Sequence, residues 1–200
     1  MKVYALTEDG KFTYCTADEE NRGKGRCNHL LHKENSESLE SFMTRASEMQ
    51  QKIEIDNIKN NMKDGEFSEE SLLYIRNYIK KGKPENVEKE DFDDFCSYYK
   101  NFEDSSSKYI EAVIEHKYSL KHAPKDDVKE FQRIISEADG KRVAAHNNLI
   151  VNLKVLNKFS EDFMGLPPVY KGNISDDSIN RTKIADSLFK YKGKYNEIAS

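Results

Sequence analysis

The chain has 200 residues, of which 34% are charged and only 36% hydrophobic, and its formal net charge at pH 7 is −4. This acidity argues against a general nucleic-acid binder, which normally carries a strong basic excess. No run approaches the roughly 18 consecutive apolar residues of a membrane span, and 11 tyrosines with 10 phenylalanines argue against a disordered chain.

The first segment, "KVYALTEDGKFTYCTA", alternates apolar and polar residues on both sides of a turn. Val3 and Phe12 belong to the two apolar sets, and Asp9-Gly10 between them is a strong hairpin signal. The segment lacks the apolar region of a secretory signal. We therefore expect a cytoplasmic protein with three reduced cysteines.

Helical spacing begins near residue 36. Apolar periodicity and capping residues predict helices over about 36–63, 68–82, 88–102, 105–121, 125–138, 140–164 and 178–198. The small polar run "EDSSSK" (103–108) predicts a module boundary, and the prolines of "GLPPVYKGN" (165–173) predict an extended loop. The expected fold is mainly α. A β-hairpin module with a zinc site (1–35) precedes a helical region (36–104) and a C-terminal bundle (105–200), which together form an elongated helical bundle.

Two cysteines and two histidines near the hairpin have the chemistry of zinc ligands. Cys15 ends the second strand, and Cys27, His29 and His32 follow a spacer. Two thiolates and two imidazoles complete a closed tetrahedral structural site and select zinc over magnesium or calcium. The spacing C-x11-C-x-H-x2-H is not that of a standard finger. A carboxylate or water could replace His32, and a plain surface turn is the alternative to a Zn²⁺ site.

Other reactive residues are better explained by structure than by catalysis. The run "RGKGRC" has its glycines and lysine in the wrong order for a phosphate-binding loop. Cys96 lies among aromatic residues, which favours a buried, inert thiol. Arg142 and His146 are one helical turn apart, where an internal hydrogen-bond network is favoured over an acid–base pair. We therefore expect no enzymatic activity and assign no catalytic residue.

The C-terminal part carries three recognisable segments, "RVAAHNNLIVNLKVLNKF", "GLPPVYKGN" and "NRTKIADSLFKY". Over residues 105–195 it resembles a helical domain family of unknown function from low-GC Gram-positive bacteria and their mobile elements. The matching positions are Arg142, His146, Asn147, Asn157, Pro168, Tyr170, Gly172, Arg181 and Asp186. The last helix departs from the pattern after Tyr191, where Gly193 interrupts it. The resemblance implies a fold and a genetic context but no chemistry.

The Cys/His opening is similar to those of phage and plasmid accessory proteins, which include inhibitors of host defence. Size, acidity and helicity are also similar to phage-encoded inhibitors of type II CRISPR nucleases. This analogy implies an anti-CRISPR interaction protein that binds a bacterial defence protein and blocks nucleic-acid loading in the host cytoplasm. The acidic segment "EKEDFDDF" (88–95) offers a surface for a basic channel, although simple solvation explains it equally well.

Two further functions stay open. Arg22, Lys24, Arg26 and Lys33 surround the expected zinc site, and nearby aromatic side chains could stack on bases. The runner-up is therefore a zinc-containing nucleic-acid-binding accessory protein, although the overall acidity disfavours direct binding. A structural module within a larger assembly is the third. The sequence does not predict the oligomeric state.

Overall fold

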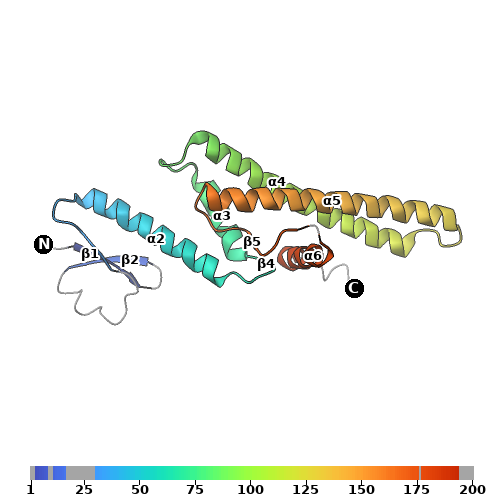
Figure 1. The fold of residues 1–200 in the computed structure, drawn as a ribbon, viewed down its shortest axis with the longest axis horizontal. Helices are drawn as coiled ribbons and strands as arrows, with labels where there is room; N and C mark the ends of the chain where they lie inside the picture. Colours follow the sequence, from blue (N-terminus) through green and yellow to red (C-terminus); the bar gives the residue numbers. More distant parts are fainter. Residues whose placement is uncertain (1–2, 9–10, 17–29, 176, 194–200) are drawn as a thin grey trace. The chain divides into compact units, whose positions relative to one another are not determined.

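The structure is a computed structural model that describes residues 3–8, 11–16, 30–175 and 177–193 (Figure 1). It is mainly helical, as the periodicity predicts. The chain divides into two compact units, Met1–Asn61 and Met62–Ser200, whereas composition predicts module boundaries near residues 35 and 104. No helix in the described ranges is both long and apolar enough to span a bilayer.

The first unit combines a small antiparallel sheet with one long helix. Its elements are β1 (Val3–Glu8), β2 (Lys11–Thr16), β3 (Leu30–His32) and α2 (Leu39–Asn61). The strand order is β2-β1-β3. Ser38 Oγ accepts a hydrogen bond from the backbone N–H of Ser41 at 3.1 Å and caps α2. Phe42 and Ala46 on α2 are fully buried, and Leu31 packs against them.

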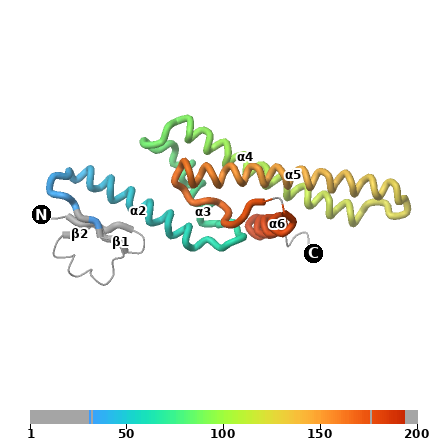
Figure 2. The backbone as a smooth tube through the Cα atoms, viewed as in Figure 1, coloured from blue at the N-terminus to red at the C-terminus, as the bar shows by residue number. Residues whose placement is uncertain are grey.

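The second unit is an assembly of helices with one two-stranded ladder. Its elements are β4 (Glu66–Phe67), α3 (Glu69–Lys81), α4 (Lys89–His122), α5 (Val128–Asp162), β5 (Tyr170–Lys171) and α6 (Ser178–Lys192). The long helices α4 and α5 pack side by side and run in opposite directions (Figure 2). Side-chain caps fix three helix starts, at Ser68, Asp127 and Asp177.

The predicted helix end near residue 102 is wrong, because α4 continues through the run "EDSSSK". Ser105 and Ser106 are only 1% and 0% exposed, so this run is part of the core and not a linker. The hydroxyl of Ser105 donates to the carbonyl of Phe102 at 3.0 Å and thereby stays within its own helix.

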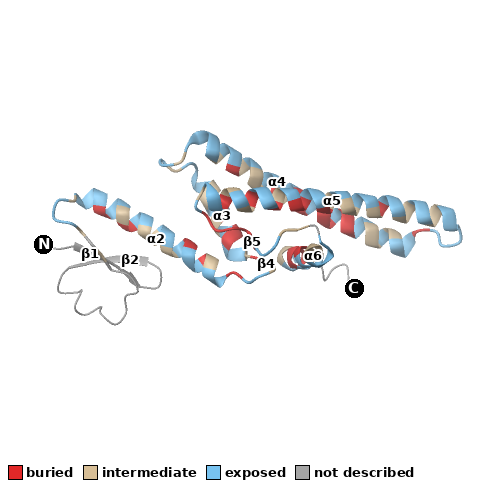
Figure 3. Ribbon diagram, viewed as in Figure 1, coloured by how far each residue is buried: buried red, intermediate tan, exposed pale blue. Residues whose placement is uncertain are grey.

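The predicted break between two helices near residue 139 is also wrong. Helix α5 continues through Gly140, whose missing side chain costs helix propensity without ending the helix. The apolar stripe of α5 is as predicted, since Leu149, Leu153 and Leu156 are all fully buried. Buried positions lie along both α4 and α5 (Figure 3), so the two helices share a continuous core.

The proline-rich segment between α5 and α6 is extended, as predicted, and closes the core of the second unit. Its strand β5 pairs with β4, with Phe67 opposite Tyr170. The backbone N–H of Phe67 donates to the hydroxyl of Ser187 on α6 at 2.7 Å. Phe67 also contacts the ring of Phe102 on α4, with ring centroids 5.9 Å apart. The ladder thus connects α6 to the long helices.

Candidate functional site

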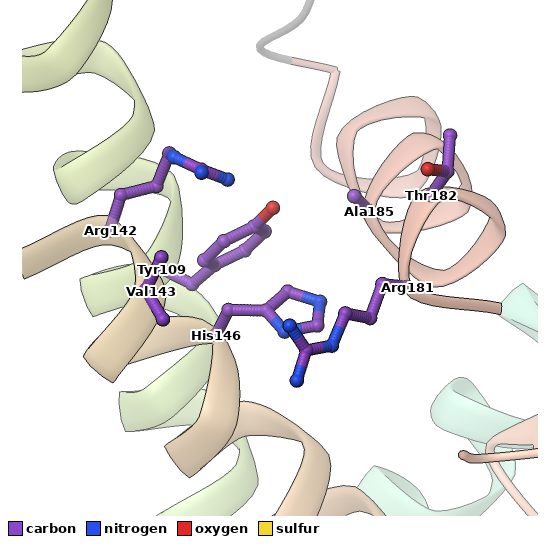
Figure 4. A pocket seen from close by; sticks show the side chains of 7 residues that line it. All are labelled: Tyr109, Arg142, Val143, His146, Arg181, Thr182 and Ala185. Atoms are coloured by element: carbon purple, nitrogen blue, oxygen red, sulfur yellow. The ribbon is translucent and has the colours of Figure 1, made fainter. Parts of the chain in front are cut away.

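A pocket of about 200 Å³ lies where α4, α5 and α6 meet (Figure 4). We call it the three-helix pocket. It is lined by Tyr109, Arg142, Val143, His146, Arg181, Thr182 and Ala185. Five of these side chains carry N–H or O–H groups, and two of the five, Arg142 and Arg181, are always cationic. This lining can donate hydrogen bonds to an acceptor-rich, anionic group.

Two neighbouring helices supply the floor of the pocket. Arg142 and His146 are four residues apart on α5 and therefore share one helix face. His146 is 5% exposed and Tyr109, from α4, is 3% exposed. Their rings meet edge to face, with centroids 5.1 Å apart and an interplanar angle of 69°. This contact fixes both rings, because edge-to-face packing is a favoured aromatic geometry.

Arg142 is held by a carboxylate on its own helix. Its Nε and Nη2 atoms donate to Asp139 Oδ1 at 3.0 and 2.7 Å, and this hydrogen bond lowers the pKa of Asp139. His116 Nε2, on α4, lies 3.8 Å from the same oxygen. The guanidinium extends toward the hydroxyl of Tyr109 (Figure 4). Burial raises the pKa of Tyr109 and the Arg142 charge opposes that rise, so the hydroxyl stays protonated and able to donate.

Arg181 enters the pocket from α6 and has less compensation. It extends toward the imidazole of His146 (Figure 4). Its Nη2 atom lies 3.5 Å from the neutral Oδ1 of Asn147, and its buried Nε has no hydrogen-bond partner among the described residues. A buried donor without an acceptor costs about 1–3 kcal/mol. A ligand oxygen that accepts a hydrogen bond from Arg181 Nε would therefore remove this cost.

Asn157, another position of the family-like pattern, has a structural role outside the pocket. Its side-chain Nδ2 donates to the carbonyl of Tyr170 at 2.7 Å, and its Oδ1 accepts from the N–H of Val169 at 2.8 Å. Ser71 Oγ donates to the carbonyl of Pro168 at 2.5 Å. Gly172 has φ +136°, and a Cβ there would lie 3.2 Å from a backbone nitrogen. These contacts fix the extended segment before α6.

The predicted zinc ligands fall at the edge of the described residues. Cys15 lies on β2 and His32 on β3, and the Cα register pairs both with Tyr4 of the central strand. Cys27 and His29 lie outside the described residues. Within the described ranges, no three His, Cys, Asp or Glu residues gather as a metal site, which leaves the four-ligand prediction untested.

Two other predicted features lie in the second unit. Cys96 is half-buried, and burial raises the pKa of its thiol, so the reactive thiolate is disfavoured. The carboxylates at the start of α4 are all exposed, and no ion pair within the described part of the chain involves them. These carboxylates are Glu88, Glu90, Asp91, Asp93 and Asp94.

Three of the pocket residues could be identified from the sequence, but the pocket itself could not. The family-like pattern includes Arg142, His146 and Arg181, and the structure brings these together. No sequence feature marks Tyr109 as a pocket residue, because the apolar spacing around it is that of any buried helix face. No protein-family model matches the chain, and no curated protein or solved structure similar to it was found. The family resemblance therefore stays a prediction.

Proposed function

We propose that the protein is a non-enzymatic binding protein whose helical unit holds an oxyanion in the three-helix pocket. One observation carries the proposal: the cationic side chains of Arg142 and Arg181 converge on one small space from different helices. Guanidinium groups bind phosphate and carboxylate oxygens through charge-assisted hydrogen bonds. The imidazole of His146 and the protonated hydroxyl of Tyr109 add two further polar groups to the pocket lining.

The charge around the pocket supports an anion as the occupant. Asp139 compensates Arg142 at 2.7 Å, whereas Arg181 makes no ion pair with any described residue. The charge of Arg181 is thus not compensated by any described residue, and its buried Nε–H has no acceptor among them. An anion supplies both the opposite charge and the missing acceptor, and a neutral ligand supplies at most the acceptor.

Isothermal titration calorimetry of the full chain with inorganic phosphate tests the proposal. We expect saturable binding, weakened about ten-fold or more by Arg181→Gln, since a hydrogen bond to a charged group contributes about 1.5–3 kcal/mol. Arg133→Gln is the matched control, because it removes the same charge at a position on α5 where the side chain is exposed and pairs with Glu130 at 2.8 Å. No binding of phosphate, sulfate or acetate by the folded protein would overturn the proposal, and so would chemical turnover of a bound ester.

At the level of the cell, we propose a phage or mobile-element protein that inhibits a bacterial defence complex. Its target would be a type II CRISPR nuclease whose nucleic-acid loading it blocks in the host cytoplasm. The favouring observation is the row of exposed carboxylates at the N-cap and first two turns of α4, which make no ion pair with any described residue. Such a row can compete with phosphates for a basic channel.

DNA binding by a purified type II CRISPR nuclease–guide complex tests this second proposal. We expect the protein to abolish the mobility shift of target DNA. Changing the five acidic residues of 88–94 to their amides should restore the shift. Glu161→Gln with Asp162→Asn, at the exposed end of α5, serves as the charge control. An unaltered shift with the unmodified protein contradicts the inhibitor proposal without affecting the oxyanion pocket.

We further propose that Cys15, Cys27, His29 and His32 hold a structural Zn²⁺ ion on the N-terminal hairpin. The strand register supports this, because Cys15 and His32 pair with the same residue of the central strand. Their Cα atoms are then about two strand spacings, roughly 10 Å, apart. That distance suits a cysteine and a histidine that share one tetrahedral ion. A nucleic-acid-binding accessory role for this module is the alternative.

A further inference from the structure

We infer that the three-helix pocket selects small phosphomonoesters among oxyanions. The inference rests on the proposed function, because it names the ligand class of the same pocket. It is carried by the directions of the donors, by the volume and by the charges around the rim.

The donors approach from two sides. The guanidinium of Arg142 and the hydroxyl of Tyr109 come from the α4–α5 side, and the guanidinium of Arg181 comes from α6 (Figure 4). Thr182 already donates its hydroxyl proton to the carbonyl of Ser178 at 2.9 Å, so it is not a free donor. A planar carboxylate presents two oxygens in one direction and is satisfied by a single guanidinium. The three terminal oxygens of a phosphomonoester spread in space and can meet both guanidinium groups together.

The volume limits the body of the ligand. Pockets for drug-sized molecules measure roughly 300–1,000 Å³, and the three-helix pocket measures about 200 Å³. It therefore encloses a phosphate head and a few further atoms. Val143 and Ala185 complete the lining with apolar surface. Such surface suits the carbon atoms next to an ester oxygen.

The charge around the pocket disfavours a long polyanion. Asp139 lies beside Arg142 at 2.7 Å, and Asp186 on α6 is close enough to influence the pKa of Tyr109. The chain as a whole carries a net charge of −4. Repulsion by these charges grows with the number of phosphates on a ligand. A single dianionic head that enters the pocket gains both guanidinium contacts with little of that repulsion.

The test compares methyl phosphate, dimethyl phosphate and acetate in calorimetric titrations of the full chain. The pH is held at least about one unit above 6, the approximate second pKa of a phosphomonoester. We expect methyl phosphate to bind at least about ten-fold more tightly than the singly charged dimethyl phosphate or acetate. Arg181→Gln should remove most of this preference, and Arg133→Gln should preserve it. Thermal unfolding of each variant confirms that the fold is retained.

Each outcome separates the two proposals. Equal affinity for methyl phosphate and acetate overturns the phosphomonoester inference and leaves the oxyanion pocket standing. No binding of any of the three, nor of inorganic phosphate, overturns both. A 5′-phosphorylated oligonucleotide that binds at least about ten-fold more tightly than methyl phosphate overturns the small-ligand part. A preference for methyl phosphate that survives Arg181→Gln with Arg142→Gln shows that the selective site lies elsewhere.

Discussion

Asn157 on α5 is hydrogen-bonded to the backbone of Tyr170, thirteen residues further along the chain, with Nδ2 2.7 Å from the carbonyl oxygen. The same amide accepts from the N–H of Val169 at 2.8 Å. One side chain thereby satisfies two backbone groups of a segment that has no helix of its own. Because this segment leads directly into α6, the amide also helps to place one wall of the pocket.

Replacing Asn157 by Ala should lower the free energy of unfolding by about 2–4 kcal/mol. Two partly buried backbone groups lose their partner, and each unsatisfied group costs about 1–3 kcal/mol. Urea unfolding followed by circular dichroism measures the change. Asn148→Ala is the matched control on the same helix, since the one side-chain hydrogen bond that the described residues give Asn148 is an exposed contact, accepted from Asn152 Nδ2 at 3.4 Å. Equal stability of the two variants would show that the amide is dispensable.

Ser106 predicts an asymmetric response to substitution. Its side chain is fully buried, and its hydroxyl has no hydrogen-bond partner among the described residues. Ser106→Ala should leave the free energy of unfolding unchanged or raise it by up to about 1 kcal/mol, because the unsatisfied hydroxyl disappears. Ser106→Val should lower it by about 1–3 kcal/mol through overpacking. Chemical unfolding of both variants measures these changes in the free energy of unfolding. A Val variant as stable as the unmodified protein would contradict close packing around Ser106.

Glu103 predicts a pH-dependent contribution to stability. It accepts hydrogen bonds from Lys192 at 2.8 Å and from Arg76 at 3.0 Å. Burial alone would raise the pKa of Glu103, but the hydrogen bonds and charges of these partners outweigh burial and lower it below its ordinary value of 4.5. The stabilisation is therefore fully present above that value and is lost as the pH falls through the lower pKa of the folded state.

Glu103→Gln should accordingly lower the free energy of unfolding at pH 7 by about 1–3 kcal/mol. The difference from the unmodified protein should shrink once the pH falls below the ordinary value of 4.5. Urea titrations across this range measure both quantities. Glu115→Gln is the control, because Glu115 pairs with Lys141 at 2.8 Å but both side chains are about half exposed. A difference that stays constant with pH contradicts the ionised role of Glu103.

The zinc proposal predicts that the mass of the purified protein includes one bound zinc ion. Native mass spectrometry of the protein, purified without added metal, should show one zinc ion per chain. Cys15→Ser and Cys27→Ser should each lose it, since both thiolates are ligands of the proposed site. Cys96→Ser should keep it, because Cys96 lies outside that ligand set in the second unit. A folded protein without metal would identify the run "NRGKGRCNHLLH" as an ordinary basic segment.

The sequence predicted those elements whose signals are local. Ser68 and Gly82 mark the ends of α3 as expected, and the prolines keep the segment before α6 extended. The two wrong helix breaks have one cause. Serines and a glycine usually mark loops, but here the packing of α4 and α5 decides, and the small residues lie within continuous helices. Local composition carries no information about such a neighbour.

The pocket was predictable only in part for a related reason. The four-residue spacing of Arg142 and His146 places both on one helix face, and this can be read from the sequence. The approach of Tyr109 and Arg181 depends on how three helices pack against each other. Contacts between distant segments contribute to it, such as the hydrogen bond between Phe67 and Ser187, which joins segments 120 positions apart.

The three-helix pocket also has a consequence for how long the protein survives in a cell. Its polar groups come from distant stretches of the chain, so an occupant recognises the folded molecule and not the unfolded one. A ligand present at about 100 times its dissociation constant adds about 2.7 kcal/mol to the free energy of unfolding. Proteases that attack transiently unfolded chains would then degrade the occupied protein more slowly. The amount of protein would follow the supply of its ligand, without any change in its synthesis.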